Sequence, residues 1–476
     1  MSNKKFLTPQ SEDFSQWYLD IVDKAELADY SAVKGCMIIR PYGYRIWELM
    51  QQDLDHRIKE AGVQNAYFPL FIPESFLTKE KDHVEGFAPE VAVVTHAGGK
   101  KLEEALIVRP TSETIMYDTY SKWIESYRDL PLLINQWANV VRWEMRTRPF
   151  LRTTEFLWQE GHTVHATKEE ADVETLRALT MYADFARDML ALPVLKGYKS
   201  EKEKFRGALY TTCIEALAKD GKSIQFGTSH NLGQNFAKPF NISFLDKDGE
   251  RKIPWQTSWG VSTRMIGALI VCHGDDDGLV LPPPVAPIQV VMVPIAKDEK
   301  ELGHLIQVCH DLKQQVPSIR IHIDNRLEVS LGFKRNEWEL KGVPLRIELG
   351  KQEIEKNSLS IARRDNKEKA TISINDWSDT VTTLLKQMTA DIYQNMEKRL
   401  EGSVHEASNL QEFEAALERG GYVKAYFCED GEMEQKIQEK TKATTRLVAL
   451  DEPEKKGVCF YSGKPAKRRW YFAKAY

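Results

Sequence analysis

The stretch NVVRWEMRTRPFLRTTEFLWQEGHTVH, residues 139–165, consists of two strand-like arms around a short charged connector. In the first arm, Arg142 and Glu144 alternate with Val141 and Trp143, a period of two that is typical of a half-buried strand. The second arm repeats this alternation and carries aromatic side chains on one face. The stretch therefore predicts two paired strands that turn charged side chains toward one side.

The connector MRTRPFLRT contains Arg146, Arg148 and Arg152 and is expected to attract anions. A guanidinium can grip a phosphate through two hydrogen bonds, whereas a lysine ammonium cannot. Glu144 lies two residues after Arg142, on the same side, and could accept a hydrogen bond from an amino group such as that of adenine. The alternative is a hairpin whose charged side chains form only surface salt bridges.

This arrangement resembles motif 2 of the class II aminoacyl-tRNA synthetases. The segments VVRWE and FLRTTEFLWQEGH resemble the prolyl-tRNA synthetases in their archaeal- and eukaryotic-type form. The resemblance implies an α+β catalytic core, an antiparallel sheet flanked by helices, with an α/β anticodon-binding domain and a small α/β C-terminal domain. It also implies the reaction: L-proline and ATP form prolyl-adenylate and pyrophosphate, and the prolyl group passes to the 3′ end of tRNA(Pro) with release of AMP.

Length and composition are typical of a folded soluble protein with two to four domains. The chain has 476 residues, of which 42% are hydrophobic and 28% charged, and its six cysteines are too scattered to indicate a disulfide framework. The opening MSNKKFLTPQSEDF has no apolar run that would serve as a secretion signal, and no run of 18 apolar residues predicts a membrane span. We therefore expect a cytoplasmic protein. The net charge of −5 neither predicts nor excludes nucleic-acid binding.

The first part of the chain predicts a helix over residues 13–29 and a longer one from about Tyr42 to Ala61, followed by Gly62. A strand is expected over residues 65–72. A long helix followed by a strand and a proline resembles class II motif 1, which forms the dimer interface in that family, so a homodimer is implied. A plain helix–strand unit is the alternative.

Residues 106–117, LIVRPTSETIMY, predict a strand that runs into a helix. The RPTSE segment resembles the loop that holds the ammonium group of the amino acid in prolyl- and threonyl-specific enzymes. Thr111, Ser112 and Glu113 are therefore candidate proline-binding residues, since a carboxylate suits a cationic amine. Helix capping is the alternative role for a hydroxyl and a carboxylate at this position.

Three later segments resemble further parts of the active site. A helix is expected over residues 168–191, and residues 199–217, KSEKEKFRGALYTTCIEAL, resemble an insertion that closes over bound proline, with Phe205 against its ring; a solvated Lys/Glu face is the alternative. In IQFGTSHNLGQNF, residues 224–236, a phenylalanine stands where many relatives have glycine. The segment WGVSTRMIGALIVCHGDDDGLVLPPPVAP, residues 259–287, resembles motif 3, with Arg264 at the start of an apolar helix.

The resemblance implies a role for each matched residue. The expected catalytic residues are Arg142, between the α-phosphate and the carboxylate of proline, and Arg264, on the outer phosphates. Mg²⁺ neutralises the remaining charge, and Gln225 is a candidate contact to it. No general base is needed, because the attacking carboxylate is already ionised at neutral pH. The expected proline-binding residues are Thr111, Ser112, Glu113, Arg142, Trp158, His162, Phe205 and His230. The expected ATP-binding residues are Arg142, Glu144, Arg152, Thr153, Gln225, Thr228, Ser262 and Arg264.

Prolines at 282–284 and 287 mark a boundary, so the expected domains are residues 1–284, 285–395 and 396–476. Alternating strands and helices follow, from IQVVMVPI to LSIARRD. The segment NEWELKGVPLRIELG resembles the class IIa anticodon-binding domain, in which Glu339 and Arg346 would hydrogen-bond guanine edges; surface salt bridging is the alternative.

The C-terminal part resembles a zinc-binding domain that has lost part of its ligand set. Cys428 and Cys459 remain, but Met433 and Ser462 stand where cysteines would be expected. Structural zinc usually needs four thiolate or imidazole ligands, so we expect no zinc here. The chain ends YFAKAY, and the resemblance implies that Tyr476 can reach toward the active site.

Two other functions remain open from the sequence. One is activation of threonine or alanine on the same scaffold, although the first domain shows no Cys/His/His set for the catalytic zinc of a threonine enzyme. The other is a catalytically silent relative that binds tRNA or a regulatory partner. Such a relative should have lost an arginine from motif 2 or motif 3, yet Arg142, Arg152 and Arg264 are all present.

Overall fold

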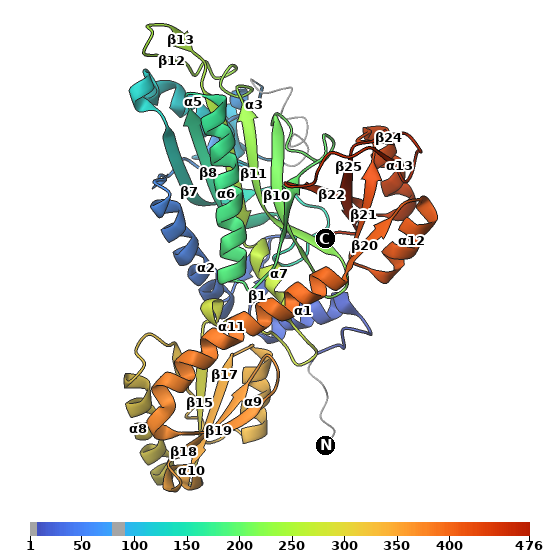
Figure 1. Ribbon diagram of the computed structural model, residues 1–476. Helices are drawn as coiled ribbons and strands as arrows, with labels where there is room; N and C mark the ends of the chain where they lie inside the picture. The colour runs from blue at the N-terminus through green and yellow to red at the C-terminus, as the bar shows by residue number, and fades with distance from the viewer. Residues whose placement is uncertain (1–6, 79–90) are drawn as a thin grey trace.

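The computed structural model describes residues 7–78 and 91–476 (Figure 1). The first six residues, which belong to the opening segment considered above for a secretion signal, lie outside the described residues. Within the two described ranges, no helix is both long enough and apolar enough to cross a membrane.

One sheet of eleven strands runs through the catalytic and C-terminal parts of the molecule, in the order β20-β21-β25-β22-β9-β10-β11-β14-β8-β7-β3. From β22 to β7 every neighbouring pair is antiparallel, and only β3 joins the catalytic end in parallel. The catalytic strands are β3 (Gln64–Asn65), β7 (Leu132–Val141), β8 (Glu155–His165), β9 (Leu195–Tyr198), β10 (Tyr210–Leu217), β11 (Ser223–Gly233) and β14 (Trp255–Ser262). The remaining strands are β20 (Val404–Ala407), β21 (Tyr422–Phe427), β22 (Thr444–Ala449) and β25 (Arg468–Ala473).

Helices cover this sheet and form the main core with it. Helix α6 (Lys168–Asp188) packs on β8, β10, β11 and β14, and Figure 1 shows it along the face of these strands. Its start is fixed by a capping box in which the Thr167 hydroxyl accepts from the Glu170 N–H and the Glu170 carboxylate accepts from the Thr167 N–H. The other helices here are α1 (Phe14–Lys24), α2 (Pro41–Glu60), α3 (Glu74–Thr78), α5 (Glu113–Trp123) and α7 (Arg264–His273).

Smaller sheets complete the catalytic part. They are β1 (Ala28–Tyr30) with β2 (Met37–Ile39), β12 (Phe244–Leu245) with β13 (Arg251–Lys252), and β4 (Phe71–Pro73) with β6 (Lys100–Val108) and β5 (Ala92–Ala97). Together with the large sheet, they give the antiparallel class II core flanked by helices that the resemblance implied.

The anticodon-binding part is a five-stranded mixed sheet in the order β16-β15-β17-β18-β19. Its buried core gathers apolar side chains of these strands, of α8 and of the first half of α11. The alternation of strands and helices expected from the sequence is confirmed. The elements are β15 (Val290–Ile295), α8 (Glu299–Gln314), β16 (Ile321–Ile323), α9 (Leu331–Leu340), β17 (Leu345–Gly350), α10 (Lys351–Glu355), β18 (Ser358–Arg363) and β19 (Lys369–Ser373).

Helix α11 (Trp377–Gly402) is continuous and carries the chain from the anticodon-binding part to the C-terminal part (Figure 1). There α12 (Leu410–Arg419) and α13 (Gly431–Thr441) accompany strands β20 to β25, including the short pair β23 (Gly457–Val458) and β24 (Pro465–Ala466). Because β22 pairs with β9, the C-terminal strands extend the catalytic sheet. A Cβ at Gly197 would come within 2.1 Å of the Val448 carbonyl oxygen, so this close pairing requires glycine.

Three element predictions need correction. The helix expected over residues 13–29 ends at Lys24, because Glu26 adopts a φ of 58° and Ala28 begins a strand. The strand expected over residues 65–72 is interrupted, since the N–H and carbonyl of Phe68 bond to the side chains of Gln136 and Arg109, and not to a neighbouring strand.

The third correction concerns the first arm of the opening stretch. Strand β7 ends at Val141, so Arg142 and Glu144 lie in the connector and not on the strand. The Arg142 N–H donates to the Thr154 carbonyl at 2.8 Å, and the Val141 N–H donates to the Arg109 carbonyl at 3.0 Å. The first of these bonds continues the register of the β7–β8 pair, but the Thr154 N–H donates to the Gly35 carbonyl at 2.8 Å and not to Arg142, so the ladder stops here.

Candidate active site

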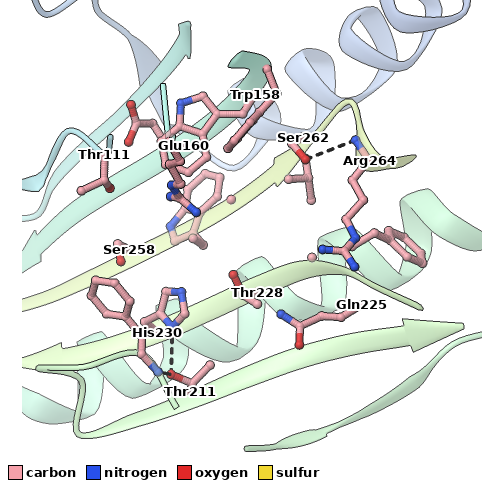
Figure 2. A pocket seen from close by; sticks show the side chains of 18 of the residues that line it. Thr111, Trp158, Glu160, Thr211, Gln225, Thr228, His230, Ser258, Ser262 and Arg264 are labelled. Carbon is pink, nitrogen blue, oxygen red and sulfur yellow. Dashed lines mark hydrogen bonds between the residues drawn. The ribbon is translucent and has the colours of Figure 1, made fainter. Parts of the chain in front are cut away.

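A cavity of about 470 Å³ lies over β8, β14, β11 and β10 (Figure 2), and residues of the arginine-rich connector also line it. Most residues expected at the site line this single cavity. They are Thr111, Glu113, Arg142, Glu144, Arg152, Thr153, Trp158, His162, Phe205, Gln225, Thr228, His230, Ser262 and Arg264. Ser112 is the exception within the catalytic part, because its fully buried hydroxyl turns away from the cavity.

Strand register brings together residues that are far apart in sequence. His162 of β8, Ser258 of β14 and His230 of β11 are direct neighbours in one row across the sheet, and Thr211 of β10 continues the row. Alternation along β8 points Trp158 and His162 into the cavity. The cavity floor is therefore made of residues from four antiparallel strands.

A β-bulge adjusts the register of β11. Ile214 pairs with Gly227 and Glu215 pairs with Gln225, so Phe226 is the extra, unpaired residue. The bulge reverses the alternation, which is why Gln225 and Thr228, an odd number of positions apart, both line the cavity. Phenylalanine at this position is thus accommodated in a buried bulge.

The end of the cavity near α5 is acidic. The Thr111 hydroxyl donates to the Glu113 carboxylate, and Ser112 donates to Glu160 Oε1 at 2.5 Å. Ser112 is the N-cap residue of α5 but makes no capping bond with its side chain, so capping does not explain its hydroxyl. Gln136 Nε2 also donates to Glu160 Oε1, at 2.9 Å. Two carboxylates, those of Glu113 and Glu160, thus line this end of the cavity.

His162 connects to these carboxylates. Its Nε2 lies 3.0 Å from Glu160 Oε2. Burial alone would lower the pKa of His162, but the hydrogen bond to Glu160 and the charges of Glu113 and Glu160 raise it above its ordinary value. This end of the cavity is therefore suited to a small ligand that carries a positive charge.

His230 lies two strands from His162 in the same row and is neutral. Thr211 Oγ1 lies 2.9 Å from His230 Nδ1, and the Phe205 N–H donates to the same Oγ1 at 2.9 Å (Figure 2). The Phe205 ring is tilted against the His230 ring, with centroids 4.9 Å apart. Burial, together with the charge of His162, lowers the pKa of His230 to about 3. Phe205 and His230 form an apolar wall that suits a ring of methylene groups.

The other end of the cavity is rich in arginine. Arg142 Nε donates to the Pro110 carbonyl at 2.9 Å, and its guanidinium carbon lies 5.5 Å from the ring centroids of both Phe156 and Trp158. Arg152 lies within 3.5 Å of the Glu144 carboxylate, and its side chain is 58% exposed. Arg142 is thus held in place by its surroundings, while Arg152 is available to a ligand at the mouth.

Arg264 lies deeper, at the start of α7. Its Nη2 donates to the main-chain oxygen of Tyr476 at 2.9 Å, which agrees with the expectation that Tyr476 reaches toward the site. Its Nε is buried and has no hydrogen-bond partner among the described residues. Burial, with the charges of Arg446 and Arg152, lowers the pKa of Arg264 to about 10. A buried guanidinium whose Nε has no partner in the described part of the chain is suited to an anionic ligand such as a phosphate.

The cavity residues that were missed from the sequence include Glu160, Lys199, Thr211 and Ser258. Glu160 could have been found, because it continues the alternation of Phe156, Trp158 and His162. The others follow from strand pairing, and no local signal marked them. The Ser258 hydroxyl is buried without a hydrogen-bond partner in the described part of the chain.

Glu339 and Arg346 lie together in the anticodon-binding part. Arg346 Nη1 donates to Glu339 Oε1 at 2.7 Å, and Arg346 Nε donates to Glu348 Oε1 at 2.9 Å. They line a pocket of about 260 Å³ whose other residues are mostly basic: Arg363, Arg364, Lys367 and Lys369, with Asp277 and Ala362. Both expectations for this pair, hydrogen bonds to guanine edges and a salt bridge, are compatible with the geometry. The two residues form a salt bridge, and this salt bridge lies in a pocket lined mostly by basic residues.

The C-terminal cysteines lie close to a serine. Cys428 Sγ is 3.5 Å from Ser462 Oγ, Cys459 is buried, and Met433 packs against the same apolar core. Over residues 7–78 and 91–476, no group of three or more His, Cys, Asp or Glu side chains is placed to hold a metal ion. Absence of zinc stays a prediction, to be tested on the protein.

Comparisons with known proteins agree with this geometry. Residues 94–273 match the model of the tRNA synthetase class II core domain (G, H, P, S and T), and residues 289–384 match an anticodon binding domain. Residues 410–476 match a domain described as prolyl-tRNA synthetase, C-terminal. The chain is 54% identical to the proline–tRNA ligase of Natranaerobius thermophilus over 99% of this chain and 98% of the relative.

The chain belongs to the prolyl-tRNA synthetase family. It is also 53% identical to the proline–tRNA ligase of a Roseiflexus species, over 99% of this chain and all of the relative, and 52% identical to that of Porphyromonas gingivalis, over 99% of both. These family members come from bacteria, so the expected archaeal- and eukaryotic-type form is not borne out.

Proposed function

We propose that this chain activates L-proline with ATP and transfers the prolyl group to the 3′ end of tRNA(Pro), with release of pyrophosphate and AMP. The observation that carries the proposal is one cavity with paired carboxylates at one end and arginines at the other, in a chain of the prolyl-tRNA synthetase family. A cationic amine fits the first end and a polyphosphate fits the second. An α-amino acid and ATP together satisfy both.

Proline is assigned to the acidic end. Glu113, with Thr111, would accept the two hydrogens of the secondary ammonium, while Glu160 and His162 complete the wall behind it. The pyrrolidine ring would lie against Phe205, His230 and Trp158, whose apolar faces border the same space. Ser112, the remaining expected contact, is assigned a supporting role through its bond to Glu160.

ATP is assigned to the arginine-rich end. Arg142 would bridge the carboxylate of proline and the α-phosphate, because it is held between the acidic end and the connector. Arg152 and Arg264 would take the outer phosphates. Glu144, Thr153, Thr228 and Ser262 line the remaining wall, where adenine and ribose can be bound.

The chemistry requires positioning and charge stabilisation more than proton transfer. The ionised carboxylate of proline attacks the α-phosphorus in line, the bond to the bridging oxygen breaks, and pyrophosphate leaves with the electron pair. Preorganised cations at the phosphates stabilise the charge that develops, which is typically the largest contribution to such a step. Mg²⁺, when bound to the phosphates, supplies further charge neutralisation. Gln225 offers an amide oxygen to the cavity, and an oxygen ligand of this kind fits an ion that is otherwise held by phosphates and water.

Further features are proposed from the family resemblance. Glu339 and Arg346, in their basic pocket, are proposed to contact the anticodon of tRNA(Pro). A cytoplasmic homodimer is proposed, and it is supported by large apolar side chains exposed near motif 1, such as Tyr30 at 70% and Tyr67 at 73%. The domain limits are proposed as residues 1–284, 285–395 and 396–476, supported by three largely separate buried cores.

The decisive experiment is exchange of labelled pyrophosphate into ATP, run separately with proline, threonine, alanine and cysteine. Exchange at far lower concentrations of proline than of the other amino acids is expected. Exchange with none of them, in protein shown to be folded by circular dichroism, would favour a catalytically silent tRNA-binding protein instead.

A further inference from the structure

The segment that leads to Phe205, residues 199–205, is attached to the C-terminal domain. Two consecutive residues at its start, Lys199 and Ser200, are buried although both are polar. Ser200 Oγ donates to Glu434 Oε1 of α13 at 2.9 Å, and Thr445 of β22 donates to the same oxygen. The contact joins residues 234 positions apart in the chain.

Glu434 is itself buried, with 3% of its surface exposed. No salt bridge to a Lys or Arg of the described residues accompanies it; its bonds go to the two hydroxyls. Burial raises the pKa of Glu434 above its ordinary value, and the hydroxyl hydrogen bonds only partly offset this. A buried carboxyl group between two hydroxyls is costly unless both bonds are made, so it fixes the relative position of the segment and the domain.

Further contacts extend the attachment on both sides. Lys202 Nζ donates to Gln435 Oε1 at 2.5 Å and to Gln438 Oε1 at 3.1 Å, both on α13. Before Ser200, the Lys199 ammonium donates to Glu215, which also accepts from Arg446 of β22. The start of the segment is therefore held by the C-terminal domain directly through Ser200 and Lys202, and indirectly through Lys199 and Glu215.

The other end of the segment enters the substrate cavity. The Phe205 N–H donates to Thr211 Oγ1, which lies 2.9 Å from His230 Nδ1, and the Phe205 ring packs on the His230 ring. Only four residues separate Ser200 from Phe205. A shift of the start of the segment would therefore move the aromatic wall of the cavity.

From these contacts we propose that the C-terminal domain sets the position of the Phe205 wall, and that Glu434 is the positioning residue which transmits this constraint through Ser200. The proposal rests on the proposed function, in which Phe205 contacts the ring of proline. It gives the C-terminal domain a role in amino acid binding that does not depend on a bound metal.

The test compares variants in pyrophosphate exchange, with KM measured separately for proline and ATP. Glu434→Leu removes the acceptor, Glu434→Gln keeps an oxygen at the same position, and Ser200→Ala removes the donor from the other side. Glu432→Gln, an exposed change on the same helix, is the matched control. Hydrogen exchange of the amides of residues 200–205, followed by mass spectrometry without substrates, gives a second readout.

We expect Glu434→Leu to raise KM for proline about tenfold, equivalent to about 1.4 kcal/mol, with kcat and KM for ATP changed less than about twofold, as for loss of uniform binding. Ser200→Ala should raise KM for proline in the same direction, and the double variant should add little to Glu434→Leu. Glu434→Gln and the control should stay within about twofold of wild type. Amides of residues 200–205 should exchange faster in Glu434→Leu alone among the three Glu variants.

The proposal would be overturned if both Glu434→Leu and Ser200→Ala left KM for proline and the hydrogen exchange of the amides of residues 200–205 unchanged. A fall in kcat with both KM values unchanged would also overturn it. Absence of proline-dependent pyrophosphate exchange in the wild-type enzyme is a different result, because it refutes the proposed function. Hydrogen exchange of the amides would still measure how firmly residues 200–205 are attached to the C-terminal domain.

Discussion

Replacing Glu215 by glutamine should destabilise the junction between the catalytic and C-terminal domains. Glu215 is fully buried in β10, where Lys199 donates to one carboxylate oxygen at 2.9 Å and Arg446 donates to the other at 2.7 Å. Ser223 donates a further hydrogen bond to it. Removing the negative charge leaves two buried cations facing a neutral amide, a change that strongly destabilises buried ion pairs.

The magnitude follows from the pKa of Glu215. Burial by itself would raise this pKa, but Arg446 and Lys199 hold it at about 2, below the usual 4.5. Because one unit of pKa corresponds to about 1.4 kcal/mol, the ionised carboxylate contributes roughly 3 kcal/mol to folding at neutral pH. Since the folded pKa is lowered, the contribution is complete above about pH 4.5 and is lost as the pH falls toward 2.

The assay is urea and thermal unfolding of wild type and Glu215→Gln, both followed by tryptophan fluorescence at several pH values. At pH 7 the variant should be less stable by about 3 kcal/mol, and its Tm should be lower by about 3 °C, given about 2 cal/mol/K of unfolding entropy per residue. The difference between the two proteins should narrow as the pH falls below 4.5. Glu418→Gln, an exposed change in α12, is the control and should match wild type throughout. Equal stability at pH 7, or a difference of the same size at pH 3, would refute the reasoning.

Three further outcomes are expected. Arg142→Ala should lower proline-dependent pyrophosphate exchange by roughly 10²-fold or more, the scale of one lost transition-state contact, and unchanged exchange would remove Arg142 from its central role. Gly161→Ala should lower the unfolding free energy by about 1–3 kcal/mol, because a Cβ there would come within 2.3 Å of the Trp259 ring. An unchanged Tm together with an unchanged near-ultraviolet circular dichroism spectrum would contradict this prediction. Elemental analysis of the purified protein should find far less than one zinc per chain, and a stoichiometric amount would show that Cys428 and Cys459 have further ligands.

Much of the site was predictable because class II chemistry uses residue types that stand out locally. Arginines in a connector, a carboxylate after Arg109-Pro110 and an arginine at the start of an apolar helix are visible without coordinates. The strand expected across Arg142 was wrong for a reason that is distant in sequence, since the Thr154 N–H donates to the Gly35 carbonyl and not to Arg142, which ends the β7–β8 ladder. The interrupted strand over residues 65–72 has a similar cause, in which the side chains of Gln136 and Arg109 take the main-chain groups of Phe68.

The sequence by itself determined the order of elements, the identity of the charged groups and the family to which they point, because these depend on local periodicity and residue type. Only the tertiary structure decided which groups meet. Glu215 and Arg446 are 231 positions apart, and Ser200 and Glu434 are 234 apart, and each pair meets because β22 lies against β9. Strand order and register are set by burial across the whole sheet, and a shift of one residue would turn every second side chain to the opposite face.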